Sequence, residues 1–137
     1  MLAVHTVHRD YVGEKQAMSA DLFTERLARV RQRFAASLQS KIEETYAALP
    51  KLCGDAPDIT NTLGAAYRRI HGIVGVGPSV GFVATGHAAK AVEKVLVGPY
   101  RATRGLAADE ADALEKALHV LREAAQLELQ SNDTDGR

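Results

Sequence analysis

Residues 65–82 read AAYRRIHGIVGVGPSVGF, and this stretch decides the fold that the sequence predicts. Its apolar residues recur every three or four positions, which is the spacing of one buried face of an α-helix. We expect Asp58 or Thr60 to cap this helix and Gly77-Pro78 to interrupt it, because proline lacks the backbone N–H and clashes with the preceding turn. The apolar face comprises Leu63, Ala66, Tyr67, Ile70, Ile73 and then Val74 or Val76.

A longer apolar stripe precedes this segment. We expect a helix that starts at Asp21, whose side chain can cap it, and that ends at or just before Pro50. Residues 1–20 show no clear period and are interpreted as a flexible or short helical lead-in. The stripe consists of Phe23, Leu27, Val30, Phe34, Leu38, Ile42, Thr45 or Tyr46, and Leu49.

Two helices are predicted after the interruption. The third should run from about Ser79 to Val97 and stop at Gly98-Pro99. The last should start near Ala107, because acidic residues in a first turn suit the helix dipole. The residues expected to face inward are Val83, Ala88, Ala91, Val92 and Val95 in the third helix, and Leu114, Ala117, Leu118, Leu121, Ala124, Ala125 and Leu127 in the last.

Four amphipathic helices with short connections can bury their apolar faces only against one another. No segment shows the period-two alternation that is typical of strands. The predicted fold class is therefore all-α, an antiparallel up-down four-helix bundle. The lead-in covers residues 1–20, the bundle covers residues 21–130, and the polar residues 131–137 are expected to be disordered.

Composition excludes several classes of function. Lys plus Arg and Asp plus Glu each number 17 in 137 residues, so no net charge favours nucleic acid or an anionic membrane. No run of apolar residues reaches the roughly 20 that a membrane span needs, and no secretory signal is apparent, so the cytoplasm is the expected compartment. A single cysteine, Cys53, rules out an internal disulfide and a cysteine-based zinc cluster. His5 and His8 lack further ligands, and we predict no metal site.

The chemistry is predicted to lie at His71. Gly64, Arg68, His71 and Gly75 are spaced by three and four residues, so they share one face of the helix, mostly apart from its apolar stripe. Imidazole can act as an uncharged nucleophile near neutral pH, and an arginine offers a fork for phosphate oxygens. The missing side chain at Gly75 leaves room for another protein surface. This pattern suits a reversible phosphoryl carrier; the alternative is a solvated histidine without a role.

The same glycines also suggest a nucleotide-binding loop. The dinucleotide fingerprint G-x-G-x-x-G would use Gly75 and Gly77, but Val80 stands at its third glycine position and Gly81 comes one residue late. No Gly-Lys-Ser/Thr triplet follows, and no strand is predicted before the loop. Nucleotide binding is therefore the weaker interpretation.

The segments Arg69–Gly75, Val80–Phe82 and Ala88–Glu93 together resemble the signature of the histidine-containing phosphotransfer (HPt) family. In this resemblance, which covers about Leu22 to Gln126, His71 matches the phosphoaccepting histidine and Gly75 the glycine four residues later. Val80-Gly81 matches a later Leu-Gly or Phe-Gly pair, and Val92-Glu93 a Leu-Glu pair. Val74 stands where many members carry a lysine, whose charge Arg68 and Arg69 could supply instead.

The resemblance implies a function and a set of partners. His71 would be the phosphoacceptor, and the phosphate or partner-docking residues would be Arg68, Arg69, Val74, Gly75 and Gly64. The partners would be response-regulator receiver domains, a hybrid histidine kinase, or both. Mg²⁺ would sit on the receiver, and this chain would bind no cofactor of its own. The chain would be a monomeric phosphocarrier in two-component signalling, and not an enzyme.

Two alternatives remain open at this point. The first is an HPt-like module that binds and modulates receivers without carrying phosphate, which the missing lysine at Val74 makes plausible. The second is an unrelated helical-bundle protein or subunit.

Overall fold

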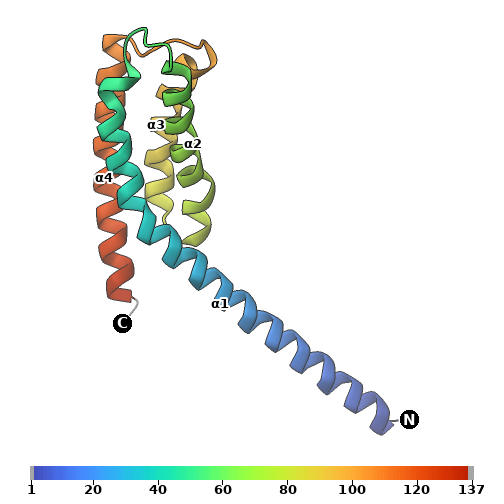
Figure 1. Cartoon of the computed structure of the whole chain (residues 1–137). Helices are drawn as coiled ribbons and strands as arrows, with labels where there is room; N and C mark the ends of the chain where they lie inside the picture. The colour runs from blue at the N-terminus through green and yellow to red at the C-terminus, as the bar shows by residue number, and fades with distance from the viewer. Residues whose placement is uncertain (1, 136–137) are drawn as a thin grey trace.

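The computed structural model describes the backbone of residues 2–135 and the side chains of residues 19–131. Four α-helices follow one another along the chain: α1 (Leu2–Ala48), α2 (Ile59–Val76), α3 (Val83–Arg101) and α4 (Ala108–Asp135). Short 3-10 helices, η1 (Leu49–Leu52) and η2 (Gly77–Val80), follow α1 and α2. Residues 2–135 contain no β-strand, which confirms the predicted all-α class. Figure 1 shows the C-terminal part of α1 lying beside α2 and α4, and α3 packs against α2 and α4.

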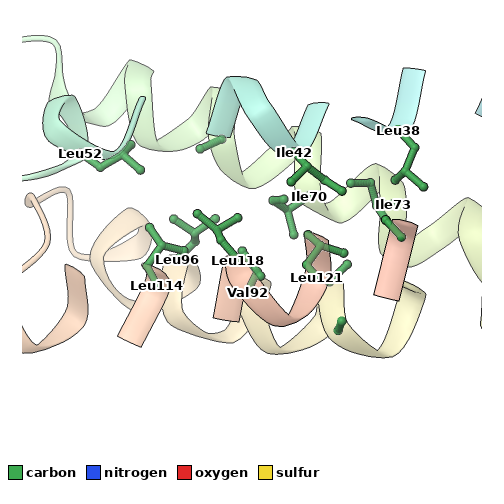
Figure 2. Packing of buried hydrophobic residues seen from close by; sticks show 14 of the residues in the cluster. Leu38, Ile42, Leu52, Ile70, Ile73, Val92, Leu96, Leu114, Leu118 and Leu121 are labelled. Atoms are coloured by element: carbon green, nitrogen blue, oxygen red, sulfur yellow. The ribbon is translucent and has the colours of Figure 1, made fainter. Parts of the chain in front are cut away.

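One hydrophobic core lies between these helices. In Figure 2, side chains of α1 and α2 face those of α3 and α4 across it. Each fully buried leucine or isoleucine contributes roughly 1.5–3 kcal/mol relative to an exposed one, so this shared core sets the positions of the helices. The labelled core residues are Leu38 and Ile42 of α1, Leu52 of η1, Ile70 and Ile73 of α2, Val92 and Leu96 of α3, and Leu114, Leu118 and Leu121 of α4.

The first helix is longer than predicted. It starts at Leu2, so the expected start at Asp21 is wrong, and Asp21 lies inside the helix where its side chain caps nothing. No proline precedes Pro50, and a helix interior tolerates a single glycine such as Gly13 at a cost of about 1 kcal/mol. The absence of an apolar period in residues 1–20 therefore did not mark an end of the helix.

The N-terminal half of α1 leaves the other helices and projects away from them (Figure 1). The predicted stripe is buried only from Phe34 onward. Phe23 and Val30, which were expected to face a core, are 68% and 40% exposed. The reason is geometric: this part of α1 diverges from the other helices, so they do not cover its apolar face (Figure 1).

The turn between α2 and α3 confirms the predicted interruption at Gly77-Pro78, but α3 starts at Val83 and not near Ser79. Gly81 has a φ of +95°, a conformation that favours glycine, and it terminates η2. Phe82 then enters the core, where its ring centroid lies 5.0 Å from that of Phe34.

The α3 helix also ends later than predicted. It continues through Gly98-Pro99 to Arg101, and Pro99, which has no backbone N–H to donate, lies within its last turn. Val83 and Ala91 were expected to face the core, but both are exposed.

The last helix starts at Ala108, close to the predicted Ala107. The predicted disordered tail is wrong for residues 131–135, which continue the helix, and residues 136–137 lie outside the described residues. Leu127, predicted to face inward, is 68% exposed. Among the described residues, none of the helices combines the length and the apolar character that crossing a membrane needs.

Candidate functional site

His71 projects from α2 into solvent, as the helical spacing predicted. Its side chain is 62% exposed, and its Nδ1 lies 2.8 Å from Oε2 of Glu93 on α3. Glu93 itself is only 16% exposed, so the surrounding helices hold this carboxylate in place. The pair joins two helices from positions 22 residues apart in the sequence.

The Glu93 contact selects one form of the neutral imidazole. A carboxylate oxygen accepts a hydrogen bond, so Nδ1 carries the hydrogen and donates it, and the lone pair resides on Nε2. Nε2 makes no hydrogen bond to any side chain among residues 19–131. The site therefore presents an uncharged nucleophilic nitrogen with an acidic group on the opposite side of the ring.

A stack of aromatic rings supports the imidazole of His71. The ring of Tyr67, one helical turn before His71, lies parallel to the imidazole within 12°, with the centroids 5.6 Å apart. Tyr67 stacks in turn on Tyr100 of α3, at 5.3 Å between centroids. The sequence analysis assigned Tyr67 to the buried stripe of α2 and did not consider Tyr100.

The glycines near His71 have two different roles. A Cβ built on Gly72 or Gly75 would meet no atom within 4 Å outside its own turn of helix, so both positions are open to an approaching surface. Gly64 is different, because it is buried and its Cβ would lie 3.1 Å from both Arg68 Nη1 and Tyr100 Cε1. Gly64 therefore makes room for the aromatic stack, whereas Gly72 and Gly75 make room around His71.

The other predicted docking residues, Arg68, Arg69 and Val74, lie in different surroundings. Arg68 is exposed on the same face of α2 as His71. Arg69 points instead to α1, where its Nε lies 3.2 Å from Glu44 and its Nη1 donates to the Thr45 hydroxyl. Val74 packs partly buried against the core. The structure thus leaves Arg68 exposed on this face, with its Nη1 near Gly64, whereas Arg69 is turned toward α1.

A shallow cavity of about 240 Å³ lies between α1 and α2 beside this face. Gly72 and the 38%-exposed Val76 form its α2 side. Arg33 and Lys41 of α1 contribute positive charge to its lining. The cavity next to His71 in the sequence of α2 thus has both apolar and cationic lining residues, which suits a partner with acidic groups.

Other candidate chemistry is weaker. His119 of α4 pairs with Glu123 one turn later, at 3.2 Å. It lines a cavity of about 700 Å³, where the Arg122 guanidinium lies over the Tyr46 ring at 3.7 Å from its centroid. Burial raises the pKa of Tyr46. This tyrosine is therefore no readier to ionise than a free one.

Among the described side chains, the cysteine gives no further site. Cys53 lies against the Leu49 carbonyl. Among residues 19–131, no three His, Cys, Asp or Glu side chains gather to hold a metal ion. His5 and His8 lie outside the described side chains.

The sequence could have identified Glu93 as a candidate site residue, but it could not have shown that Glu93 contacts His71. Glu93 was identified only as half of the Val92-Glu93 pair in the family resemblance, and its position beside His71 depends on how α2 and α3 pack. Comparison of the chain with family models, with curated proteins and with solved structures gives no significant match.

Proposed function

We propose that this chain is a histidine phosphotransfer protein, which carries a phosphoryl group on His71 between receiver-domain aspartates. The observation that supports this proposal is the exposed imidazole with Nδ1 paired to Glu93 and Nε2 directed to no protein partner. The proposal includes the finer fold assignment, an antiparallel up-down four-helix bundle of the HPt type.

In the proposed reaction, the Nε2 lone pair of His71 attacks the phosphorus atom of a receiver's aspartyl phosphate. The N–P bond forms while the P–O bond to aspartate breaks, and the carboxylate leaves with the bonding electron pair. The proton on Nδ1 stays in place, so the phosphorylated ring becomes positively charged. The Glu93 carboxylate, 2.8 Å away, offsets that charge, as a buried carboxylate does for a catalytic histidine. The reverse reaction passes the phosphoryl group to another receiver.

The remaining chemistry belongs to the receiver, which brings the Mg²⁺ ion and most of the charge that stabilises the transferred group. This chain supplies the nucleophile and a surface on which the receiver can sit. Gly72 and Gly75 leave that surface open, and Arg68 offers a guanidinium on the same face. With no phosphate source of its own, the chain would be both substrate and carrier.

Phosphotransfer from a labelled receiver tests the proposal. The chain is mixed with receiver domains carrying ³²P-phosphoaspartate, and label on this chain is followed over time. We expect label that is acid-labile and base-stable, absent in His71→Gln and retained in His119→Gln. His119 is the matched control because its side chain is 63% exposed and also pairs with a glutamate.

Three outcomes separate the candidate functions. Label that depends on His71 supports the carrier. Receiver binding without transfer of label contradicts it and supports the phosphate-free docking module. If no receiver binds, both interpretations fail and an unrelated helical protein remains.

A further inference from the structure

Three rings lie in a row at the candidate site. Tyr100 of α3 stacks on Tyr67 of α2 with an interplanar angle of 21°, and Tyr67 stacks on His71 with an angle of 12°. The centroid distances of 5.3 and 5.6 Å are within the range of favourable aromatic pairs. The imidazole is the exposed end of this row, since His71 is 62% exposed while both tyrosines pack partly buried against the core.

The row depends on a missing side chain at Gly64. A Cβ at this position would lie 3.1 Å from Tyr100 Cε1, so even a methyl group would require the Tyr100 ring to shift by a few tenths of an ångström. Tyr67 is three residues after Gly64 and four before His71, so all three lie on neighbouring positions of one helical face. The α2 backbone at Gly64 thus leaves room for the Tyr100 ring of α3, which supports Tyr67.

Two contacts restrain the imidazole in different directions. The hydrogen bond to Glu93 holds its Nδ1 edge, and the Tyr67 ring covers one of its faces. The hydrogen bond alone would still allow the ring to rock about the axis through Nδ1. The stack removes that freedom, and the direction of the Nε2 lone pair is then fixed relative to α2.

We propose that Tyr67, supported by Tyr100, is a positioning residue that holds the plane of the His71 imidazole for phosphoryl transfer. This inference rests on the proposed function. Tyr67 touches the nucleophilic ring but takes no part in bond making: the N–P bond forms at Nε2, and the P–O bond to the receiver's aspartate breaks. Its contribution is to orient the lone pair along the line of attack, and small errors in such an alignment lower rates substantially.

The test replaces the ring without adding or removing charge. In Tyr67→Leu the stack is lost, and we expect the transfer rate at saturating receiver to fall about tenfold, because orientation is lost while the docking surface is unchanged. The receiver concentration that gives half the maximal rate should stay within about twofold. In Tyr67→Phe the ring remains, and both values should match those of the original chain.

A second measurement reports the stack without any receiver. A tyrosine ring stacked on the imidazole shifts the His71 Hε1 and Hδ2 NMR signals by its ring current. We expect that shift to persist in Tyr67→Phe and to disappear in Tyr67→Leu. Tyr100→Leu removes only the support, so it should weaken the shift and lower the rate less than Tyr67→Leu does. This variant also serves if Tyr67→Leu unfolds.

The outcomes separate this inference from the proposed function. If the original chain accepts label and Tyr67→Leu transfers at the same maximal rate, the positioning role is wrong and the carrier function stands. A rise in the half-saturating receiver concentration at an unchanged maximal rate would place Tyr67 in docking and would also overturn the inference. If the original chain accepts no label from any receiver, the proposed function fails, and the inference fails with it.

Discussion

Two histidines of this protein are equally exposed and each has a glutamate partner, but they differ in how that partner is held. His71 and His119 are 62% and 63% exposed, and each has a glutamate oxygen near a ring nitrogen, at 2.8 and 3.2 Å. The partner of His71 comes from another helix and is 16% exposed, whereas the partner of His119 lies one turn along the same helix and is 63% exposed. Exposure and a nearby carboxylate therefore do not define a site.

The difference lies in what the fold holds in place. A pair four residues apart on one helix surface contributes only about 0.2–0.5 kcal/mol, and its side chains move freely in water. The carboxylate of Glu93 is fixed by the packing of α2 against α3, and Tyr67 covers one face of the His71 ring. His71 has a restrained orientation and a restrained tautomer, while His119 has neither.

The largest effect should come from filling the open space beside His71. Gly75→Leu places a branched side chain one turn after the histidine, and we expect the transfer rate to fall at least 100-fold, because a receiver can no longer approach. The fold should be preserved, since no atom lies within 4 Å of a Cβ at this position and leucine favours a helix more than glycine does.

Gly98→Leu is the matched control for this variant. Gly98 is also helical and also has an open Cβ position, but it lies on a different side of α3 from Glu93. Its transfer rate should match that of the original chain. Equal rates in Gly75→Leu and the original chain would show that receivers do not use this surface, and thermal unfolding of both variants would exclude loss of the fold.

A smaller effect is expected at the two glutamates. Glu93→Gln keeps a hydrogen-bond acceptor but removes the negative charge that offsets the phosphorylated ring, so transfer should slow by about tenfold. Glu123→Gln should leave the rate unchanged, because nothing couples His119 to the reaction. The rate of phosphoryl transfer from the labelled receiver measures the effect of both substitutions. If the two variants behaved alike, the distinction between the two histidines would be lost.

The smallest expected effect is a change in stability, and it concerns a third glutamate, Glu110. Both oxygens of Glu110 accept from the Arg104 guanidinium, at 2.6 and 3.0 Å, and the Ala107 N–H also donates to it. These bonds lower the pKa of Glu110 to about 2. The folded protein thus binds this proton less readily than the unfolded chain, so the stabilisation is present above pH 4.5 and is lost as the pH falls toward 2.

We therefore expect Glu110→Gln to lower the Tm slightly at pH 7 and to leave it unchanged near pH 2. Glu123→Gln should change the Tm at neither pH, because its pair with His119 is open to solvent. Calorimetric scans across this range would measure both. An equal loss of Tm at both pH values in Glu110→Gln would mean that the side chain acts through packing and not through its charge.

The sequence predicted the helical elements better than their ends. The period of apolar residues and the Gly77-Pro78 break are local signals, and they located α2 and its order in the chain correctly. The extension of α1 before Asp21 was missed, because an apolar period reports contact with a core and a helix can continue without one. Gly98-Pro99 was predicted to stop α3, but the helix continues past Pro99 to Arg101.

The candidate site could be predicted only as far as a single helix reaches. The spacing of His71, Arg68 and Gly75 within α2 is fixed by helical geometry, and both the exposure of the histidine and the open space at Gly75 followed from it. The contact with Glu93 and the stack with Tyr100 depend on the register between two helices. No local pattern encodes that register. Arg69 was included as a docking residue because its charge could replace the lysine missing at Val74, and its pairing with Glu44 on α1 could not be predicted either.

The turn between α2 and α3 contains the feature that sets this register. A Cβ on Gly86 would lie 2.5 Å from Pro78 Cγ, so the first turn of α3 rests directly against the proline. His71 is seven residues before Pro78, and Glu93 is seven residues after Gly86. Counting from this point of contact, equal lengths of antiparallel helix bring the two side chains to the same height. The contact between Gly86 and Pro78 thus fixes how far along α2 the α3 helix is placed. A methyl group added at Gly86 would shift α3 along α2. It would thereby displace the side-chain pairs between the two helices, although it would contact none of those pairs.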